Sequence, residues 1–168
     1  MINKLGETKA EVLIDTVEEN RNAAISLVKQ ANCSIEIFTQ DMDAEIYNNI
    51  EFERCILSLA KKHQNTRIRI LTNDSRKSVQ NGHCLLRLAQ SLTSSVFIHN
   101  PSQQHRNEQC AFLLADKVGL LHRASATNRN FQASVSFMSP QRAGKLLDYF
   151  NEAWEHSTPD MQTRRIYM

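Results

Sequence analysis

The chain has 168 residues, a length typical of one domain that buries roughly 70% of the surface of its unfolded chain. Its 20 Lys and Arg residues against 18 Asp and Glu residues leave a formal charge of +2, too balanced to indicate nucleic-acid or membrane binding by itself. The 4 glycines are too scattered for a Gly-x-Gly-x-x-Gly or Walker loop, which excludes nucleotide folds built on glycine-rich phosphate loops.

The cysteines and the amino terminus indicate a reduced protein without a membrane span. Cys33, Cys55, Cys84 and Cys110 form no Cys-x-x-Cys pair, and no His-x-x-x-His pair occurs. We therefore expect reduced core cysteines, no metal and no cofactor. The amino terminus lacks an apolar signal core, and the longest apolar run is only Cys110 to Ala115. We expect a cytoplasmic protein.

Hydrophobic spacing predicts alternating helices and strands in the first half of the chain. A capping-box pattern at Thr8–Glu11 and an apolar stripe predict a helix over residues 8–31. Alternating apolar residues predict strands at Ser34–Phe38 and Arg67–Leu71. Two further stripes predict a helix that follows Asp43 and ends near His63, and a helix that carries Val79 to Leu92.

The second half reads as strands followed by a closing helix. A strand at Ser95–His99 precedes a polar loop, and a hairpin of Cys110–Ala115 and Val118–His122 turns at Asp116–Lys117. A weaker strand is expected at 131–137. A helix with Ser139 as N-cap and Pro140 at its first position follows.

This order of elements predicts a single α/β domain over residues 1–168, with a core of about 8–157 and an exposed tail at 158–168. We expect a mixed, largely parallel sheet flanked by helices, because the early strands alternate with helices. Ligands gather at the carboxyl ends of such strands, where Thr39–Asp43 and Thr72–Lys77 are polar. In the second segment, Asp74 or Ser75 is expected to cap the following helix.

The chain resembles one repeat of the phospholipase D superfamily over roughly residues 8–157, and the motifs that carry the resemblance lie in its second half. In that superfamily, a strand carrying His-x-Lys-x-x-x-x-Asp is followed by a second strand, a Gly-Ser-x-Asn-type turn and a helix ending in Phe-x-x-x-Trp. The matching stretch here runs from Gln109 to Asp116, continues through Ser125 and Asn128, and closes with Phe150–Trp154. The resemblance implies a phospholipase D-like half with a single repeat.

The chain is also similar to a family of uncharacterised bacterial proteins. Members of that family carry Gln-Asp/Asn-Gly-His and Phe-x-x-x-Trp-Glu stretches, which are Gln80–His83 and Phe150–Glu155 here. We expect His83 to be a packed or capping histidine rather than a ligand, because apolar residues follow it.

The catalytic side chains of the phospholipase D motif are missing. With Asp116 at the aspartate of the motif, Gln109 occupies the histidine position and Ala111 the lysine position. In active members the histidine forms a covalent phosphohistidine and the lysine holds the phosphate charge. Glutamine offers neither a nucleophile nor a titratable nitrogen near neutral pH. The resemblance thus implies no catalytic residue, and degenerate motif positions at Gln109, Ala111, Asp116, Ser125 and Asn128.

Other basic residues beside the expected pocket could hold a phosphate or another anion. These are His105, His122, Arg123 and Arg129. Arginine offers a two-pronged donor to phosphate, but no spacing among these residues is specific, so solvated rim residues are the simpler interpretation. Arg67 and Arg69 share one face of their strand, which favours charged protection of an edge strand over a binding stripe.

The sequence therefore favours a non-catalytic phospholipase D-like domain that acts in binding or assembly. Single-repeat members of the superfamily pair so that their half-sites face each other, which implies a homodimer with the hairpin Cys110–Leu121 near the contact. One alternative is a phosphodiesterase or nuclease that uses His105 or His122 in a rearranged site. Another is a weak module for nucleic acid or a phosphorylated ligand, although aromatic residues make up only 7% of the chain.

Overall fold

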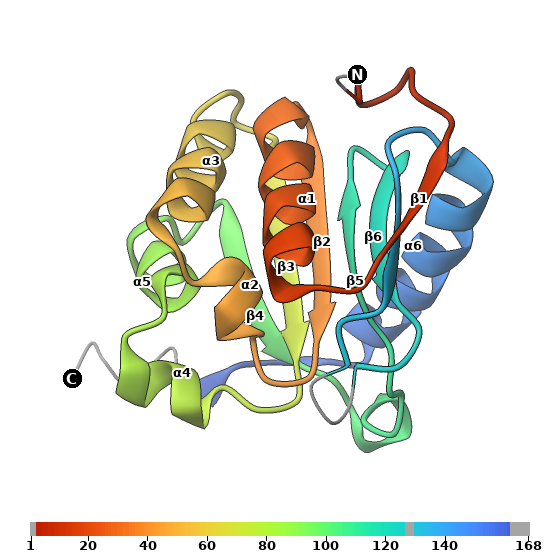
Figure 1. Ribbon diagram of the computed structural model, residues 1–168. Helices are drawn as coiled ribbons and strands as arrows, with labels where there is room; N and C mark the ends of the chain where they lie inside the picture. Colours follow the sequence, from red (N-terminus) through yellow and green to blue (C-terminus); the bar gives the residue numbers. More distant parts are fainter. Residues whose placement is uncertain (1–2, 127–129, 162–168) are drawn as a thin grey trace.

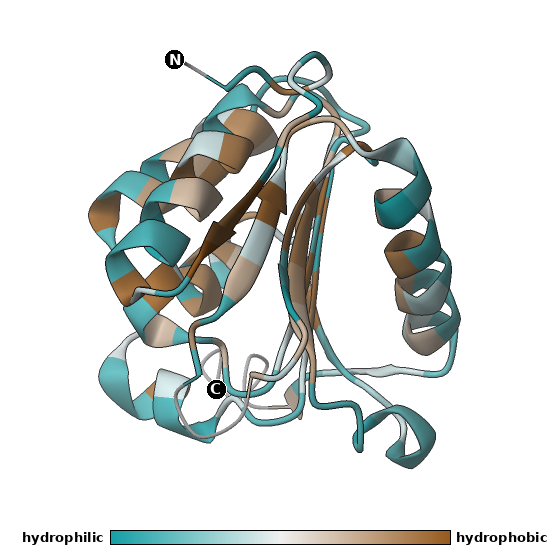
Figure 2. Cartoon of the chain, turned by 45° about the vertical axis from the view of Figure 1, so that its right-hand side comes forward, coloured by the Kyte–Doolittle hydropathy of each residue, from teal (hydrophilic) through white to brown (hydrophobic). Residues whose placement is uncertain are grey.

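The computed structural model describes residues 3–126 and 130–161, which form a mixed sheet of 8 strands between two layers of helices (Figures 1 and 2). The strand order is β1-β7-β6-β5-β2-β3-β4-β8. The strands are β1 (Glu11–Ile14), β2 (Ser34–Thr39), β3 (Arg67–Thr72), β4 (Val96–Asn100), β5 (Ala111–Ala115), β6 (Gly119–Arg123), β7 (Ala133–Ser136) and β8 (Thr158–Pro159). The helices are α1 (Val17–Gln30), α2 (Ala44–Tyr47), α3 (Ile50–Ala60), α4 (Arg76–Asn81), α5 (Cys84–Ser91) and α6 (Pro140–Glu155), with a 3-10 turn η1 (Gln103–His105).

The expected mixed sheet flanked by helices is confirmed, but its largely parallel character is not. Within the described residues, β2, β3 and β4 pair in parallel, and every other neighbouring pair is antiparallel. The antiparallel pairs are β1-β7, β7-β6, β6-β5, β5-β2 and β4-β8. Parallel pairing needs a crossover, and helices supply the crossovers between β2, β3 and β4, whereas a tight turn at Asp116–Lys117 joins β5 to β6 as an antiparallel hairpin.

The predicted first helix begins later than expected, because its first residues form a strand instead. Glu11–Ile14 is β1, which pairs antiparallel with β7 near the other end of the sequence. Helix α1 starts behind a second capping box, in which the Thr16 hydroxyl accepts from the Glu19 N–H at 3.0 Å and the Glu19 carboxylate accepts from the Thr16 N–H at 3.3 Å. A distant strand partner therefore overrode the local pattern at Thr8.

The two middle helices of the sequence interpretation are each divided. Asn49 starts α3 by accepting a hydrogen bond from the Phe52 N–H at 2.8 Å. Gly82, with φ +67°, ends α4 in the left-handed conformation. His83 then caps α5 through its Nδ1, which accepts from the Leu85 N–H at 3.1 Å, as expected of a capping histidine.

The segment predicted as an exposed tail contributes the last strand of the sheet. Thr158 and Pro159 are exposed but pair with Asn100 and His99 of β4. The Asp160 N–H then donates to the Ile98 carbonyl at 3.0 Å, and Asp160 is buried. No helix in residues 3–126 and 130–161 is long and apolar enough to cross a membrane.

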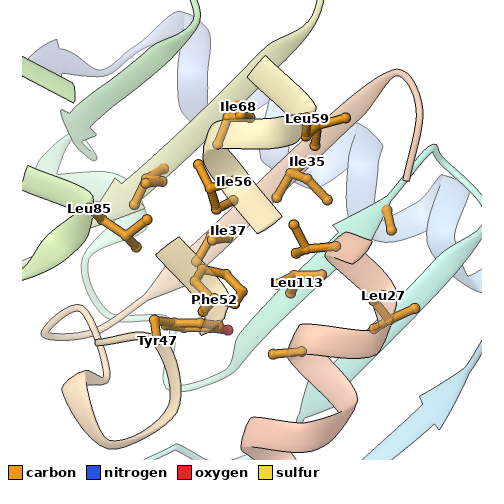
Figure 3. Packing of buried hydrophobic residues seen from close by; sticks show 14 of the residues in the cluster. Leu27, Ile35, Ile37, Tyr47, Phe52, Ile56, Leu59, Ile68, Leu85 and Leu113 are labelled. Carbon is orange, nitrogen blue, oxygen red and sulfur yellow. The ribbon is translucent and has the colours of Figure 1, made fainter. Parts of the chain in front are cut away.

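Alternation along the strands creates two apolar layers. Ile35 and Ile37 point towards α1 to α5, where they pack with Leu27, Phe52 and Ile56 (Figure 3). The opposite face packs against α6 through a smaller cluster of Phe38, Leu71, Phe112, Leu114, Leu120, Ala143, Phe150 and Ala153.

A buried ion pair joins β2 and β3 on the α6 face. Arg69 Nη2 lies 3.4 Å from Glu36 Oε2 and donates to Asn151 Oδ1 at 2.9 Å. The expected edge-strand role of Arg67 and Arg69 is wrong, because β3 lies between β2 and β4 inside the sheet. Burial raises the pKa of Glu36, against the opposing effect of Arg69.

Candidate functional site

The carboxyl ends of β2, β3 and β4 meet the amino end of β5 and the carboxyl end of β6 at one edge of the sheet. The register fixes this meeting, since Phe38 lies opposite Phe112 and Ala111 lies opposite Arg123. We call this edge, with the loops that follow Thr39 and Thr72, the carboxyl edge; it is the lower edge in Figure 1. Ligands of open α/β sheets bind at such an edge.

Three of the degenerate motif positions come together at the carboxyl edge. Gln109 is exposed, and its carbonyl accepts from the Ala126 N–H at 2.8 Å, which places Ser125 beside it. Ala111 is 3% exposed, so its methyl group is enclosed where the motif has a lysine. Asn128 and Arg129 lie outside the described residues.

Asp116 lies at the opposite end of the sheet, away from Gln109. Its carboxylate accepts from the backbone N–H groups of Asn32, Cys33 and Ser34 at 2.8, 2.8 and 3.1 Å. It occupies the hairpin turn with φ +52°, a conformation that aspartate tolerates better than most residues. Asp116 therefore fixes the start of β2 to the hairpin turn.

A network of neutral amides fills part of the carboxyl edge. Gln40 Nε2 donates to the carbonyls of Glu108 and Cys110 at 2.8 and 2.9 Å. Asn73 Nδ2 donates to Gln40 Oε1 at 2.7 Å. The network holds the loops after β2 and β3 against the segment that enters β5. The polar segments predicted from the sequence contain Gln40 and Asn73, but no sequence pattern assigns a role to either residue, although both directly follow strands.

Arg123 is engaged by an acidic partner at the same edge. Its Nη1 lies 3.0 Å from Asp43 Oδ1, and their side chains are only 4% and 13% exposed. Its Nε and Nη2 donate to the Asn130 carbonyl at 3.2 and 2.9 Å, and the guanidinium lies over the Phe131 ring. Thr39 Oγ1 donates to Asp43 Oδ2 at 2.7 Å. The Arg123 guanidinium thus links β6 to the loop after β2 and to the backbone at Asn130, and its charge is paired with the Asp43 carboxylate.

His122 lies on the other face of the sheet from Arg123, as adjacent strand residues must. It is half-buried, and burial and then Arg142 lower its pKa, which favours a neutral imidazole. It lines a hollow of about 630 Å³ beside β1 that also exposes Glu11, Asp15 and Glu19. Arg142 crosses this region, with Nη1 3.2 Å from Glu11 Oε1.

His105 is 5% exposed and packs against α6. Its Nδ1 lies 3.2 Å from Ser102 Oγ, and its ring meets Tyr149 edge-on with centroids 5.6 Å apart. A near-parallel stack with His156 covers it further. Among the described residues, no hydrogen bond or ring contact joins His105 to His122 or to Arg123, so these candidates do not form one cluster.

Metal-binding clusters and thiol acidity bear on all the described residues, not on the carboxyl edge alone. Within residues 3–126 and 130–161, no group of three or more His, Cys, Asp or Glu side chains could hold a metal ion. The four cysteines are free, but the expected core position is wrong for Cys33, which is exposed, and only Cys84 is fully buried. Burial raises the pKa of Cys84 to about 11 and that of Cys110 to about 12, which disfavours the reactive thiolate.

Comparison with known proteins supports the fold. The model of a family described as a domain of unknown function (DUF7931) matches residues 16–166. No curated protein matches the chain. Among solved structures, the chain is similar to Nuc from Salmonella typhimurium, a phospholipase D family member, with 15% identity and a TM-score of 0.63 over 90% of this chain and 97% of that one.

Two further structures extend this likeness. NucT from Helicobacter pylori is 12% identical with a TM-score of 0.63, over 90% of this chain and 99% of that one. TrmBL2, an archaeal chromatin protein with a novel mode of DNA binding, is 13% identical with a TM-score of 0.65, over 89% of this chain and 54% of that one. Such identities show the fold alone. The expected phospholipase D-like fold is confirmed.

Proposed function

The chain belongs to the DUF7931 family, and on that premise we propose that it is a non-catalytic phospholipase D-like domain that acts in binding or assembly. The observation that carries the proposal is the identity of two side chains, Gln109 and Ala111, at the histidine and lysine positions of the phospholipase D motif. Gln109 cannot attack phosphorus, and the enclosed methyl group of Ala111 cannot hold a phosphate charge.

The surroundings of these two positions support the same reading. The basic group nearest to Ala111 along the register is Arg123, whose charge is matched by Asp43. The amide network of Gln40 and Asn73 is neutral and joined to backbone carbonyls. Phosphoryl transfer by a phospholipase D mechanism needs a nucleophile and a general acid, and we infer that this site has neither. The hydrogen bonds of Gln40 and Asn73 instead hold the loops after β2 and β3 in place.

The proposal includes a homodimer and a cytoplasmic location. Four free cysteines suit a reducing compartment, where disulfides rarely persist. The proposal also includes an anion as a candidate ligand of His105, His122, Arg123 or Arg129, the last of which lies outside the described residues.

An assay with a generic activated phosphodiester tests the absence of catalysis. We expect no turnover above the uncatalysed rate, and no change in His105→Ala or His122→Ala. Turnover that either substitution abolishes would contradict the proposal, because it would identify a working histidine. Circular dichroism of both variants serves as the folding control.

A rearranged phosphodiesterase is the second candidate, and one observation favours it. The lowered pKa of His122 leaves a neutral imidazole facing a hollow, the form in which histidine acts as a nucleophile or base. The same assay decides between the two candidates.

A weak nucleic-acid or phosphate-binding module is the third candidate. The likeness to TrmBL2 in fold is the observation that favours it. Binding to a mixed-sequence DNA duplex would then fall steeply as salt rises, and a flat salt response would dismiss it.

A further inference from the structure

The two outer edges of the sheet are built differently. At one edge, β8 has 2 residues, one of them a proline, which cannot donate a ladder hydrogen bond. At the other edge, β1 has 4 residues, with Val12 41% and Leu13 78% exposed. Proline and shortness protect the first edge against pairing, whereas β1 has neither device.

The outer side of β1 presents unpaired backbone groups. β1 ends the strand order and pairs only with β7 among the described strands. In an antiparallel pair, every second residue directs its N–H and C=O away from its partner. Such a row is a template for another strand. The residues before and after β1, from Lys9 to Asp15, are also exposed except for Ile14, which is half-buried.

In an antiparallel pair of this segment with itself, the charges of Lys9 and Asp15 can face each other, whereas Glu11 faces Leu13. An antiparallel pair about a two-fold axis through Val12 places Lys9 opposite Asp15 of the second copy, twice. Ala10 then meets Ile14 of the second copy, and Val12 meets itself. Centring the axis on Leu13 would instead set Glu11 opposite Asp15, which like charges disfavour. Among the described residues, neither Lys9 nor Asp15 has an ion-pair partner.

We propose that a second copy of this chain pairs antiparallel with β1 about a two-fold axis through Val12, so that the two sheets become one. The axis stands perpendicular to the sheet, which keeps both copies of α6 on the same face. The hairpin expected at the contact offers no such edge, since β5 lies between β2 and β6, and β6 lies between β5 and β7. The inference deepens the proposed assembly role and rests on it.

Sedimentation of the full chain over a range of concentrations tests the contact. Val12→Lys sets two ammonium groups against each other at the axis, and Leu13→Lys removes the most exposed apolar side chain of β1. We expect each to raise the dimer dissociation constant by about tenfold or more. Ile50→Lys, at a residue 66% exposed on α3, is the matched control and should leave dimerisation unchanged.

Charge reversal tests the register. Lys9→Glu and Asp15→Lys should each weaken the dimer, and the double variant should restore it, because the pairs reform with opposite signs. Failure of the double variant to recover would overturn the Val12-centred register. Circular dichroism confirms that each variant is folded.

The outcomes separate this inference from the proposed function. A chain that stays monomeric throughout, or a dimer that Val12→Lys leaves intact, overturns the β1 contact. In the second case assembly survives through another surface. Pairing of β1 with a different protein segment, seen as loss of that partner in Val12→Lys without any homodimer, also overturns it. The absence of catalysis is judged only by the phosphodiester assay.

Discussion

The two faces of the sheet are covered in different ways. The face under α1 to α5 packs mainly hydrocarbon side chains, with Phe52, Ile56 and Ile35 fully enclosed (Figure 3), although His83 and Arg123 are also buried on this side. The other face has α6 alone, and there aromatic rings share space with ions: Arg69 lies 5.0 Å from the Phe150 ring centroid and beside buried Glu36. The two faces therefore differ at their centres: isoleucine, leucine and phenylalanine side chains pack on the first face, whereas an ion pair packs among the aromatic rings of the second.

The largest expected effect comes from removing a buried ring on each face. Phe52→Ala should destabilise the fold by about 3–5 kcal/mol, measured by urea unfolding, because a closed hydrocarbon layer cannot collapse into the cavity. Phe150→Ala should cost about 3 kcal/mol, near the lower end of that range, since a single helix and the Arg69 side chain can shift into the space. A larger loss of unfolding free energy in Phe150→Ala than in Phe52→Ala would contradict this difference between the two faces.

His83, the N-cap residue of α5, should make the stability of the fold sensitive to acid. Burial lowers its pKa below 6.5, because its protonated form is poorly solvated, and its Nε2 donates to the Met42 carbonyl at 3.1 Å. The unfolded chain therefore binds the proton more readily, and stability falls as pH drops below about 6.5. Asn can still cap the Leu85 N–H, so His83→Asn should flatten this loss. Unfolding curves between pH 5 and 7.5 measure it, and an unchanged acid response would assign the effect to other groups.

Glu36, on the α6 face, should respond to pH with the opposite sign and a smaller effect. Its pKa is raised above 4.5, so its contribution to stability is present at acid pH and is lost as pH rises through its folded pKa. Glu36→Gln should remove this dependence and change stability by less than about 1.5 kcal/mol at pH 7, because a neutral amide avoids the desolvation of a carboxylate.

A large loss of stability in Glu36→Gln at pH 7 would mean that the ion pair with Arg69 outweighs that desolvation. Arg69→Lys is the matched control. It keeps the charge near Glu36 and loses the flat guanidinium over Phe150, so its effect separates charge from stacking.

Short-range sequence patterns predicted the helices and strands whose formation depends on neighbouring residues. Pro140 after Ser139 marked the start of α6, and alternating residues marked β2, β3 and the β5-β6 hairpin. The assignment of Glu11–Ile14 to a helix failed, because only its pairing with β7 makes it a strand. Mistaking Arg69 for an edge residue has the same origin, since strand order is a property of long-range pairing.

Only the part of the site that depends on the order of the strands could be predicted from the sequence. Gln109, Ala111 and Ser125 share an edge, as the motif order implied. The predicted hairpin already put Asp116 at the turn, one strand length from Gln109, but nothing in the sequence showed that its carboxylate binds the backbone before β2. Partnerships such as Arg123 with Asp43 depend on side-chain geometry across loops with left-handed residues, and no spacing in the sequence encodes them.

The pairing of β1 with β7 also has a consequence for the growing chain on the ribosome. Strands β2, β3 and β4 can align soon after they emerge, because their connections are helical crossovers close in sequence. The partner of Glu11–Ile14, in contrast, is translated only after β6. During that interval β1 has no strand partner, and its valine and leucine remain available to chaperones or to neighbouring nascent chains.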